Sequence, residues 1–391
     1  MPAEGSPIRV RIQQPGLPGY RVPVFRELAS RPGLSVEVLY SGTSKVPNVD
    51  AEGFAASPVR RRALLGWPRE VRWEDAQLRA VDPAHADVAI LEFNAGVASL
   101  VPALLRARRA GVGTVLWGHG YSLRETAVAL RLRTMLAGLA DALLFYNDRG
   151  RDLFAGRGVA PEKLHVAQNA MDQRSIQDQR QEWLGQPDRL AAFRREHGLD
   201  AGPVVLFVSR LVEQNRVDLL LRAAALLHAE IPTLTVAIVG DGPEAPKLRS
   251  LAEELGLADR VRMPGAVYGE PSIAPWFLSA DVFCYPEYMG LSILHAMGYG
   301  VPVVTSGDPR VHGPEIEALR HGENGLAVDA ASADSIADAL REILADDQRR
   351  RRMGEAARAT ATTAYAVERM VDGMEAAVRF AARRAESRRR P

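Results

Sequence analysis

Short runs of apolar, often β-branched residues alternate along the chain with longer stretches in which apolar residues recur every three or four positions. The short runs are typical of buried strands, and the longer stretches are typical of amphipathic helices. Because parallel strands need a helix-length connection between them, this alternation favours parallel sheets covered by helices on both faces. We therefore predict an α/β fold.

The strand-like runs fall into two groups, each of which predicts one doubly wound sheet. The first group comprises the runs 8–13, 35–40, 87–93, 114–118, 142–146 and 164–167, with helices expected over 97–110 and 123–139. The rhythm is lost over 172–202, which we interpret as an interdomain connection with one helix around 183–197. The second group comprises the runs 204–208, 235–239, 261–263, 281–285, 301–305 and 325–328.

The chain length agrees with two domains, because 391 residues exceed what one hydrophobic core usually serves. We place an N-terminal Rossmann-like domain at 1–185 and a C-terminal one at 186–365. The remaining helical residues, 366–391, are expected to return to the first domain. Open α/β domains bind ligands at the carboxyl ends of their strands, so we expect the function in a cleft between two facing domains.

Composition narrows the class of protein. With 47% hydrophobic residues, 25% charged residues and a net charge of +1, the chain is typical of globular proteins and gives no reason to expect nucleic acid as a partner. The single cysteine, Cys284, lies in the apolar run DVFCYP and is expected to be a small buried hydrophobe. No apolar run approaches the roughly 18 to 20 residues of a membrane span, and no signal-peptide pattern opens the chain, so we expect a cytoplasmic protein.

One segment leaves two interpretations open. Residues 59–73, VRRRALLGWPREVRW, combine arginines with leucines and tryptophans. This mixture occurs in segments that rest on anionic membranes, whereas a solvated and partly packed loop is the alternative. Peripheral membrane contact through the first domain is therefore a hypothesis.

The segment PEYMGLSILHAMGYGVPVV, residues 286–304, carries the strongest chemical signal. It places Glu287 and Gly290 between a predicted buried strand and a predicted helix. The first amides of a helix have no partner within it, so they form a binding site for phosphate. A second turn, GDGPE at 240–244, follows the strand 235–239, although glycine turns of this kind are common in α/β proteins.

The segment resembles glycosyltransferase family 4, the GT-B "glycosyl transferases group 1", which shows an EGFGLPLLEAMACGxPVV-like stretch with two glutamates eight positions apart. The resemblance implies that Glu287 lies against the donor sugar and that the amides of Gly290, Leu291 and Ser292 hold its diphosphate. The family's second glutamate, which usually grips the ribose, is replaced here by His295. An imidazole offers one donor and one acceptor in place of two anionic oxygens.

The resemblance extends to FVSRLVEQNRVDLLLRA, where the family has a GRLxxxKGxDLLL pattern whose arginine and lysine pair with the diphosphate. Arg210 occupies the arginine position, which implies a catalytic, charge-stabilising role. Asn215 occupies the lysine position, and the adjacent Arg216 could replace the missing cation. Without that replacement, donor binding should weaken by about 1.5 to 3 kcal/mol, the range of a charge-assisted hydrogen bond.

Further matches to the family complete the expected donor site. Gly240 belongs to the glycine turn, Met263 and Gly265 lie on a strand whose backbone would face the nucleotide base, and Glu315 matches a family glutamate in HGPEIEALRHGENGLAV.

The N-terminal half supplies an expected acceptor side. The loop QPGLPGYRVPV contributes Gly19, Tyr20 and Arg21, and TVLWGHG ends a strand with His119. The resemblance implies that His119 contacts the transferred sugar, and we expect its charge to change near neutral pH.

By resemblance, the chain is a hexosyltransferase-like enzyme that transfers a sugar, with retention of configuration, from a nucleoside diphosphate sugar to a hydroxyl acceptor. Polysaccharide, glycolipid or metabolite acceptors of bacterial type all remain open. The resemblance also implies a reaction that needs no bound metal, and the sequence agrees, because it lacks a DxD-type carboxylate pair in a loop; no cofactor is expected. The alternatives are a catalytically silent nucleotide-sugar-binding protein, motivated by Asn215 and His295, and a sugar-nucleotide epimerase or a phosphorylase on the same fold.

Overall fold

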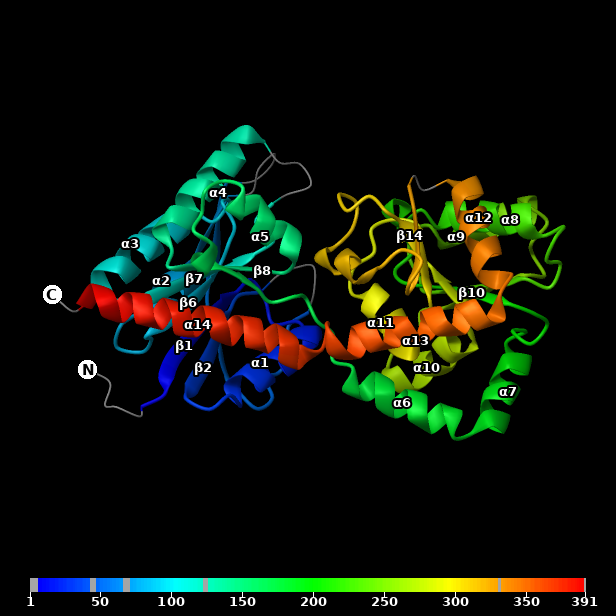
Figure 1. Ribbon diagram of the computed structural model, residues 1–391, viewed down its shortest axis with the longest axis horizontal. Coiled ribbons are helices and arrows are strands. Elements are labelled where there is room, and N and C mark those ends of the chain that lie inside the picture. The colour runs from blue at the N-terminus through cyan, green and yellow to red at the C-terminus, as the bar shows by residue number, and fades with distance from the viewer. Residues whose placement is uncertain (1–5, 43–46, 66–70, 122–125, 330–331, 390–391) are drawn as a thin grey trace. The chain divides into compact units, whose positions relative to one another are not determined.

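A computed structural model describes residues 6–42, 47–65, 71–121, 126–329 and 332–389 and confirms the α/β class. The chain forms two compact units (Figure 1). Unit 1 contains Met1–Asn169 together with Val367–Pro391, and unit 2 contains Ala170–Ala366. Each unit has its own sheet and its own hydrophobic core.

The described part of unit 1 contains a seven-stranded parallel sheet in the order β3-β2-β1-β6-β7-β8-β9. Its strands are β1 (Ile8–Gln14), β2 (Leu34–Tyr40), β3 (Ala55–Pro58), β6 (Val88–Glu92), β7 (Gly113–Gly118), β8 (Ala142–Phe145) and β9 (Leu164–Val166). The chain moves outward in one direction from β1 and in the other from β6. The carboxyl ends of β1 and β6 therefore flank the point where an open α/β sheet forms its ligand crevice.

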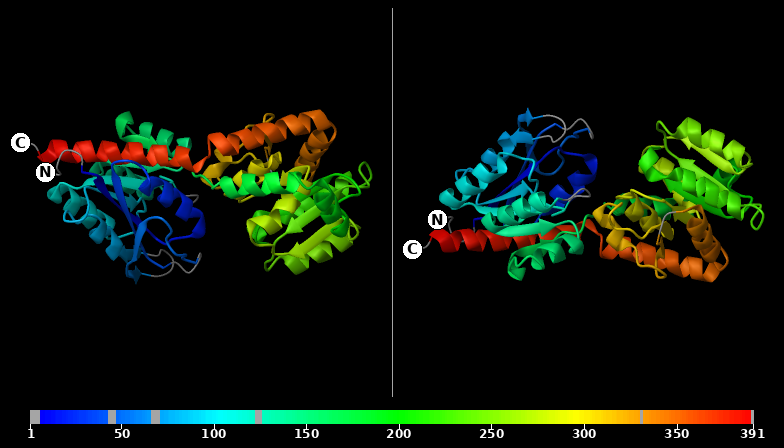
Figure 2. Two further views of the ribbon diagram at one scale, coloured as in Figure 1. Left: turned by 90° about the horizontal axis from the view of Figure 1, so that it is seen from below. Right: turned by 90° about the horizontal axis from the view of Figure 1, so that it is seen from above.

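Helices cover both faces of this sheet (Figure 2). One face carries α1 (Val22–Ala29) and α14 (Val367–Arg389), and the other carries α2 (Asp75–Ala80), α3 (Leu100–Ala110), α4 (Ala127–Leu139) and α5 (Asp148–Ala155). α14 lies against β7, β8 and β9. Its Gly373 permits this close approach, because a Cβ at that position would collide with the carbonyl oxygen of Val166.

Unit 2 repeats the scheme with a six-stranded parallel sheet in the order β12-β11-β10-β13-β14-β15. Its strands are β10 (Val204–Val208), β11 (Thr235–Val239), β12 (Val261–Gly265), β13 (Val282–Cys284), β14 (Val303–Ser306) and β15 (Gly325–Val328). Here the direction changes between β10 and β13, so the loops after these two strands flank the second expected crevice.

The helices of unit 2 form two layers (Figures 1 and 2). One layer contains α8 (Val217–Leu227), α9 (Ala245–Glu254) and α12 (Ala333–Leu344). The other contains α6 (Arg174–Leu184), α7 (Pro187–Glu196), α10 (Glu270–Ser279), α11 (Ser292–Tyr299) and α13 (Asp347–Thr363). Cys284 is fully buried in β13, as predicted, and burial raises the pKa of its thiol.

The prediction that residues 172–202 form an interdomain connection is wrong. The segment folds as two helices, α6 and α7, in place of one helix around 183–197. Both pack in unit 2, where Ile176 and Trp183 join the core and the Gln173 side chain donates to the carbonyl of Leu294 at 3.2 Å. The division between the units consequently falls at residue 169, whereas the sequence places it at residue 185.

Residues 51–74 also differ from the sequence-based expectation. They contain β3 and a separate antiparallel pair, β4 (Arg61–Leu65) with β5 (Val71–Glu74). β4 and β5 carry most of the proposed membrane-contact segment, but its Trp67 lies outside the described residues. Within the described ranges, no helix combines the length and apolar character needed to cross a bilayer.

Candidate functional site

The loop after β13 carries Glu287, and hydrogen bonds to neighbouring segments hold its backbone in place. The Pro286 carbonyl accepts a hydrogen bond from the Ser306 amide at 3.1 Å, and the Met289 amide donates to Nδ1 of His312 at 3.1 Å. Nε2 of His312 lies 2.9 Å from the Ser306 carbonyl, so the ring carries its proton on Nε2 and ties the loop to the end of β14. Burial lowers the pKa of His312, which keeps this ring neutral.

The start of α11 presents backbone donors. Among the described residues, the amides of Gly290, Leu291 and Ser292 have no partner in the protein, and no side chain caps the helix. The predicted phosphate-binding residues therefore lie where free amides and the positive end of a helix favour an anion. The buried Glu315 lies beneath this loop, with its carboxylate 4.0 Å from where a Cβ on Gly290 would be.

Tyr288 has a backbone conformation that tyrosine rarely adopts. Its φ of 62° lies in the left-handed region, at a position where the family pattern has glycine. A non-glycine residue there carries strain of about 1 to 2 kcal/mol.

We expect the free energy of unfolding of Tyr288→Gly to exceed that of Tyr288→Ala by about 1 kcal/mol, because only glycine relieves the strain. Urea unfolding curves of the two variants measure this difference. At an unstrained site the order is reversed, since alanine restricts the unfolded chain more. An alanine variant as stable as the glycine variant would show that the positive φ carries no strain.

The loop after β10 brings one predicted cation to Glu287. Arg216 also has a positive φ, 52°, and its guanidinium pairs with Asp218 at 3.1 Å. The hydrogen bond that Arg216 donates to Asp218 raises the pKa of Arg216, and the charge of Glu287 adds to this effect, so the side chains of Arg216 and Glu287 lie within electrostatic reach. Arg210 is exposed at the end of the same strand.

Asn215 has an internal role that differs from the predicted donor contact. Its side chain is buried, and its amide donates to the carbonyl of Arg210 at 2.7 Å. This hydrogen bond shapes the turn between Arg210 and Arg216. The amide is therefore committed to the backbone, and Arg216 is the residue of this pair that presents a charge.

The glycine turn after β11 packs against the loop after β10. A Cβ on Gly240 would collide with the Ser209 carbonyl, and one on Gly242 would collide with the Leu211 carbonyl. The Gly240 amide donates to the carbonyl of Gly265 at 2.8 Å, which joins this turn to the end of β12 beyond the half-buried Met263. Three predicted donor-site segments are thus held together at the carboxyl edge of the sheet.

His295 faces a carboxylate that the motif does not contain. Nε2 of His295 lies 2.9 Å from Oε1 of Glu270, which also accepts a hydrogen bond from the Tyr299 hydroxyl at 2.6 Å. Burial would raise the pKa of Glu270, but the hydrogen bonds and charge of these partners outweigh it and lower the pKa. The ring nitrogen predicted to contact ribose is therefore already engaged by α10.

Unit 1 contains a pocket of about 510 Å³ at the carboxyl ends of β1, β6, β7 and β8. Tyr20 and Arg21, which are predicted for the acceptor side, and His119, which is predicted to contact the transferred sugar, line it together with Glu92 and Asn94. Gly19 lies outside this pocket and lines a different hollow with Arg26 and Glu52. The pocket occupies the β1/β6 switch point and has the size of a small-molecule site.

Arg21 lines this pocket as a buried residue among aromatic side chains. Only 6% of the residue is exposed. Its guanidinium carbon lies 5.0 Å from the ring centres of both Trp117 and Tyr146 and 5.2 Å from that of Tyr20. Arg21 thus holds the aromatic wall together through cation–π contacts.

His119 does not behave as the predicted neutral-pH switch. Its side chain is exposed to the pocket, and the ring centres of Tyr146 and Tyr121 lie 4.8 and 6.2 Å from that of His119. Burial, with the charges of Arg21 and Arg133, lowers the pKa of His119 to about 4. The ring is therefore neutral at pH 7 and offers one hydrogen-bond donor and one acceptor.

We expect NMR titration of the His119 ring to show a midpoint well below the ordinary value of 6.5. Because the folded pKa is the lower one, this group contributes its full stability above pH 6.5 and loses it as the pH falls toward about 4. A His119→Asn variant identifies the resonance. A midpoint near 6.5 would contradict the assigned environment.

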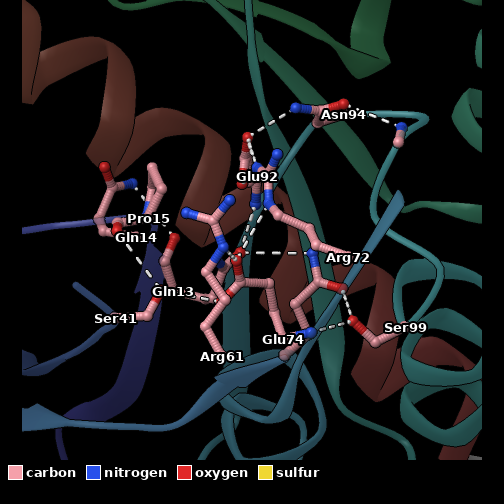
Figure 3. Close-up of polar contacts among 12 residues, drawn as sticks. Gln13, Gln14, Pro15, Ser41, Arg61, Arg72, Glu74, Glu92, Asn94 and Ser99 are labelled. Carbon is pink, nitrogen blue, oxygen red and sulfur yellow. Dashed lines mark hydrogen bonds and ion pairs between the residues drawn. The ribbon is translucent and has the colours of Figure 1, made fainter. Parts of the chain in front are cut away.

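A network of charged and polar side chains surrounds Glu92, one of the residues that line the pocket (Figure 3). Arg72 from β5 binds both oxygens of Glu92, at 2.5 and 2.6 Å, and its Nε donates to Glu74 at 3.0 Å. Glu74 is fully buried and also accepts from the Ser41 hydroxyl at 2.9 Å. Asn94 donates to Glu92 at 2.9 Å from the loop after β6.

The same contacts bear on the membrane hypothesis. Arg61 and Arg72 pair with Glu74, and Arg62 pairs with Asp75 at 3.1 Å. These arginines are therefore engaged by carboxylates of unit 1, and we do not propose that this segment contacts a membrane.

Comparisons with known proteins identify the family. A sequence model described as glycosyl transferases group 1 matches residues 191–360. The GDP-mannose-dependent alpha-(1-6)-phosphatidylinositol monomannoside mannosyltransferase of Mycobacterium tuberculosis is 30% identical over 306 residues, which cover 74% of this chain and 75% of that protein. The chain belongs to the group 1 glycosyltransferases.

Other proteins similar to this glycosyltransferase agree with the assignment. The D-inositol 3-phosphate glycosyltransferase of Kribbella flavida is 29% identical over 378 residues, covering 88% of this chain and 85% of that one. HepE from Anabaena, solved in complex with UDP, superposes with a TM-score of 0.70 at 21% identity, covering 94% of this chain and 98% of that chain. This structural likeness confirms the predicted GT-B fold.

Sequence reasoning missed three residues of this glycosyltransferase that touch the predicted sites: Glu92, Glu270 and His312. Glu92 ends a strand that was correctly predicted, so its place at a strand's carboxyl end was an available signal. His312 begins a matched segment, HGPEIEALRHGENGLAV, and could have been considered. Nothing local marks Glu270, which reaches His295 only through the packing of α10 on α11.

Proposed function

We propose that this chain is a retaining enzyme of family 4 that transfers a sugar from a nucleoside diphosphate sugar, bound by unit 2, to a hydroxyl acceptor bound by unit 1. The observation that carries the proposal is the juxtaposition at the β10/β13 switch point. Free amides at the start of α11 follow Glu287, and Arg216 lies within its electrostatic reach. Group 1 membership supports the same reaction class.

The chemistry assigns a role to each group. Sugar transfer releases a nucleoside diphosphate, so negative charge grows on the leaving phosphate oxygens. The amides of Gly290 to Ser292 and the positive end of α11 stabilise that charge, and Arg210 and Arg216 add cations. Glu287 accepts hydrogen bonds from sugar hydroxyls and orients the donor. The neutral ring of His119 contacts the transferred sugar.

The names of similar proteins support a nucleotide-sugar donor but leave its base open. The mycobacterial relative is GDP-mannose-dependent, whereas the Anabaena structure contains UDP. We propose that the base lies along the backbone of Met263 to Gly265. The ribose then meets the pair formed by His295 and Glu270, where a carboxylate is present although the motif glutamate is not.

A catalytically silent nucleotide-sugar-binding protein is the second candidate. The observation that favours it is the absence of a lysine beside Arg210, together with the internal commitment of Asn215. Isothermal titration with UDP, GDP and their glucose and mannose conjugates, followed by product analysis, separates the two. Binding with glycoside formation and a retained anomeric configuration supports the enzyme; binding without any product supports the silent protein.

We also propose that the enzyme acts in the cytoplasm on a precursor of a polysaccharide, glycolipid or glycosylated metabolite. Nucleotide sugars supply the activated glycosyl group, so no separate cofactor is proposed. Fractionation of cells producing the chain tests the location.

A further inference from the structure

The pocket of unit 1 combines one carboxylate with an aromatic wall. Tyr20, Trp117 and Tyr146 contribute rings, and Glu92 and Asn94 contribute polar groups from the end of β6. Aromatic faces pack against the C–H groups of a ring, while carboxylate and amide groups hydrogen-bond its hydroxyls. The pocket thus offers two kinds of contact that a hydroxyl-bearing ring can use together.

The Glu92 carboxylate is held in place by the protein but can still accept further hydrogen bonds. Among the described residues, Oε1 accepts from Arg72 and Asn94, and Oε2 accepts from Arg72. The Glu92 amide donates to the buried Gln13 side chain at 2.9 Å, which anchors the end of the strand. An ionised carboxylate has about four acceptor sites, so Glu92 can still accept from a ligand. Its side chain is 19% exposed.

The cations around this carboxylate are already engaged by the protein. Arg72 divides its guanidinium between Glu92 and the fully buried Glu74. Arg21 is enclosed by aromatic rings, and Arg133 interacts within the protein as well. A phosphate group binds best where several cationic donors converge on it, and a carboxylate repels it. The Glu92 end of the pocket therefore favours hydroxyl groups over an anion.

We propose, resting on the proposed glycosyltransferase function, that the acceptor enters this pocket as a neutral polyhydroxylated ring and that Glu92, oriented by Arg72 and Asn94, accepts hydrogen bonds from its hydroxyl groups. Glu92 and Asn94 are binding residues. Arg72 is a positioning residue, because it reaches the ligand only through Glu92. The acceptor class is thus a sugar or cyclitol ring, either free or as the head of a larger molecule.

Direct binding tests the proposal without needing turnover. Methyl α-D-mannopyranoside and myo-inositol serve as neutral probes, myo-inositol 1-phosphate as the charged probe and cyclohexanol as a ring with one hydroxyl. Saturation-transfer NMR should detect both neutral polyols and not cyclohexanol. Glu92→Gln should weaken polyol binding at least about 10-fold, because a neutral amide replaces a charge-assisted acceptor. Asn94→Ala provides a second variant that removes no charge from the network.

Glu37→Gln is the matched control. Glu37 also forms an arginine–carboxylate pair, with Arg11 at 2.8 Å, but lies outside the pocket lining. This variant should bind both polyols as the unchanged protein does. Arg72→Lys keeps the positive charge but loses the two-pronged guanidinium that binds both oxygens of Glu92. This variant should raise the acceptor KM more than it lowers kcat.

Three outcomes would overturn the inference. These are unchanged polyol binding in folded Glu92→Gln and Asn94→Ala, equal losses in Glu37→Gln, or stronger binding of myo-inositol 1-phosphate that improves when Glu92 is removed. UDP and GDP binding to the same variants separates this inference from the proposed function. If polyol binding depends on Glu92 but no donor supports sugar transfer, the proposed enzyme function is wrong and the polyol site stands. If sugar transfer occurs and is unaffected by replacing Glu92, the enzyme function stands and the role of Glu92 is wrong.

Discussion

Glu287→Ala is expected to lower sugar transfer by roughly 100-fold or more while leaving the protein folded. The magnitude is that of deleting one group that stabilises a transition state. Glu287 is half-buried in a loop whose backbone is held by Ser306 and His312, so its side chain is not needed to keep the loop in place. Initial rates with a UDP- and GDP-sugar panel, together with a urea unfolding curve, measure both parts.

The neighbouring carboxylate Glu213 provides the control for Glu287. Its charge also raises the pKa of Arg216, but it occupies one of the unspecified positions of the GRLxxxKGxDLLL pattern. Glu213→Ala should retain most of the activity. If Glu287→Ala keeps the unchanged rate, or if both variants lose activity equally, Glu287 has no specific role in transfer.

Arg72→Ala is expected to destabilise unit 1 by about 3 to 5 kcal/mol, the range for removing one partner of a buried ion pair. Arg72 is the cation between Glu74, whose side chain is fully buried, and Glu92. Without Arg72, the negative charges of Glu74 and Glu92 are less well neutralised in a region of low dielectric. The urea unfolding midpoint, followed by tryptophan fluorescence, measures the change. Arg62→Ala is the control, because the exposed pair of Arg62 with Asp75 should contribute about 0 to 1 kcal/mol.

The loss in Arg72→Ala should depend on pH in a defined direction. Burial, opposed by the Ser41 hydrogen bond and the Arg72 charge, raises the pKa of Glu74 above its ordinary 4.5. Between the unfolded and folded pKa values the folded protein binds the proton more tightly, so this group's contribution to stability falls as the pH rises. Without Arg72 the pKa of Glu74 rises further, and the variant should lose more stability at about pH 8 than at about pH 5. A loss that is equal at both pH values, or no larger than that of Arg62→Ala, would contradict the buried-pair interpretation.

The two sites differ in how far sequence could predict them. The proposed donor loop is contiguous, so a single motif predicts Glu287 and the amides of Gly290 to Ser292 together. The environment of His119 was not predictable in the same way. Its charge depends on Arg21 and on the crowding of the ring, and these come from η1 (Gly19–Arg21) and from several strand ends.

By itself, the sequence determined the α/β class, most strands and the residues of the proposed donor loop, because periodic burial and short-range turn chemistry are local properties. Only the tertiary structure decided the strand order that sets β10 beside β13 and β1 beside β6. It also brought Arg72 from β5 to Glu92 and Glu270 from α10 to His295. These pairs are distant along the chain and meet only when separate segments pack around a common core, a choice that no local pattern encodes.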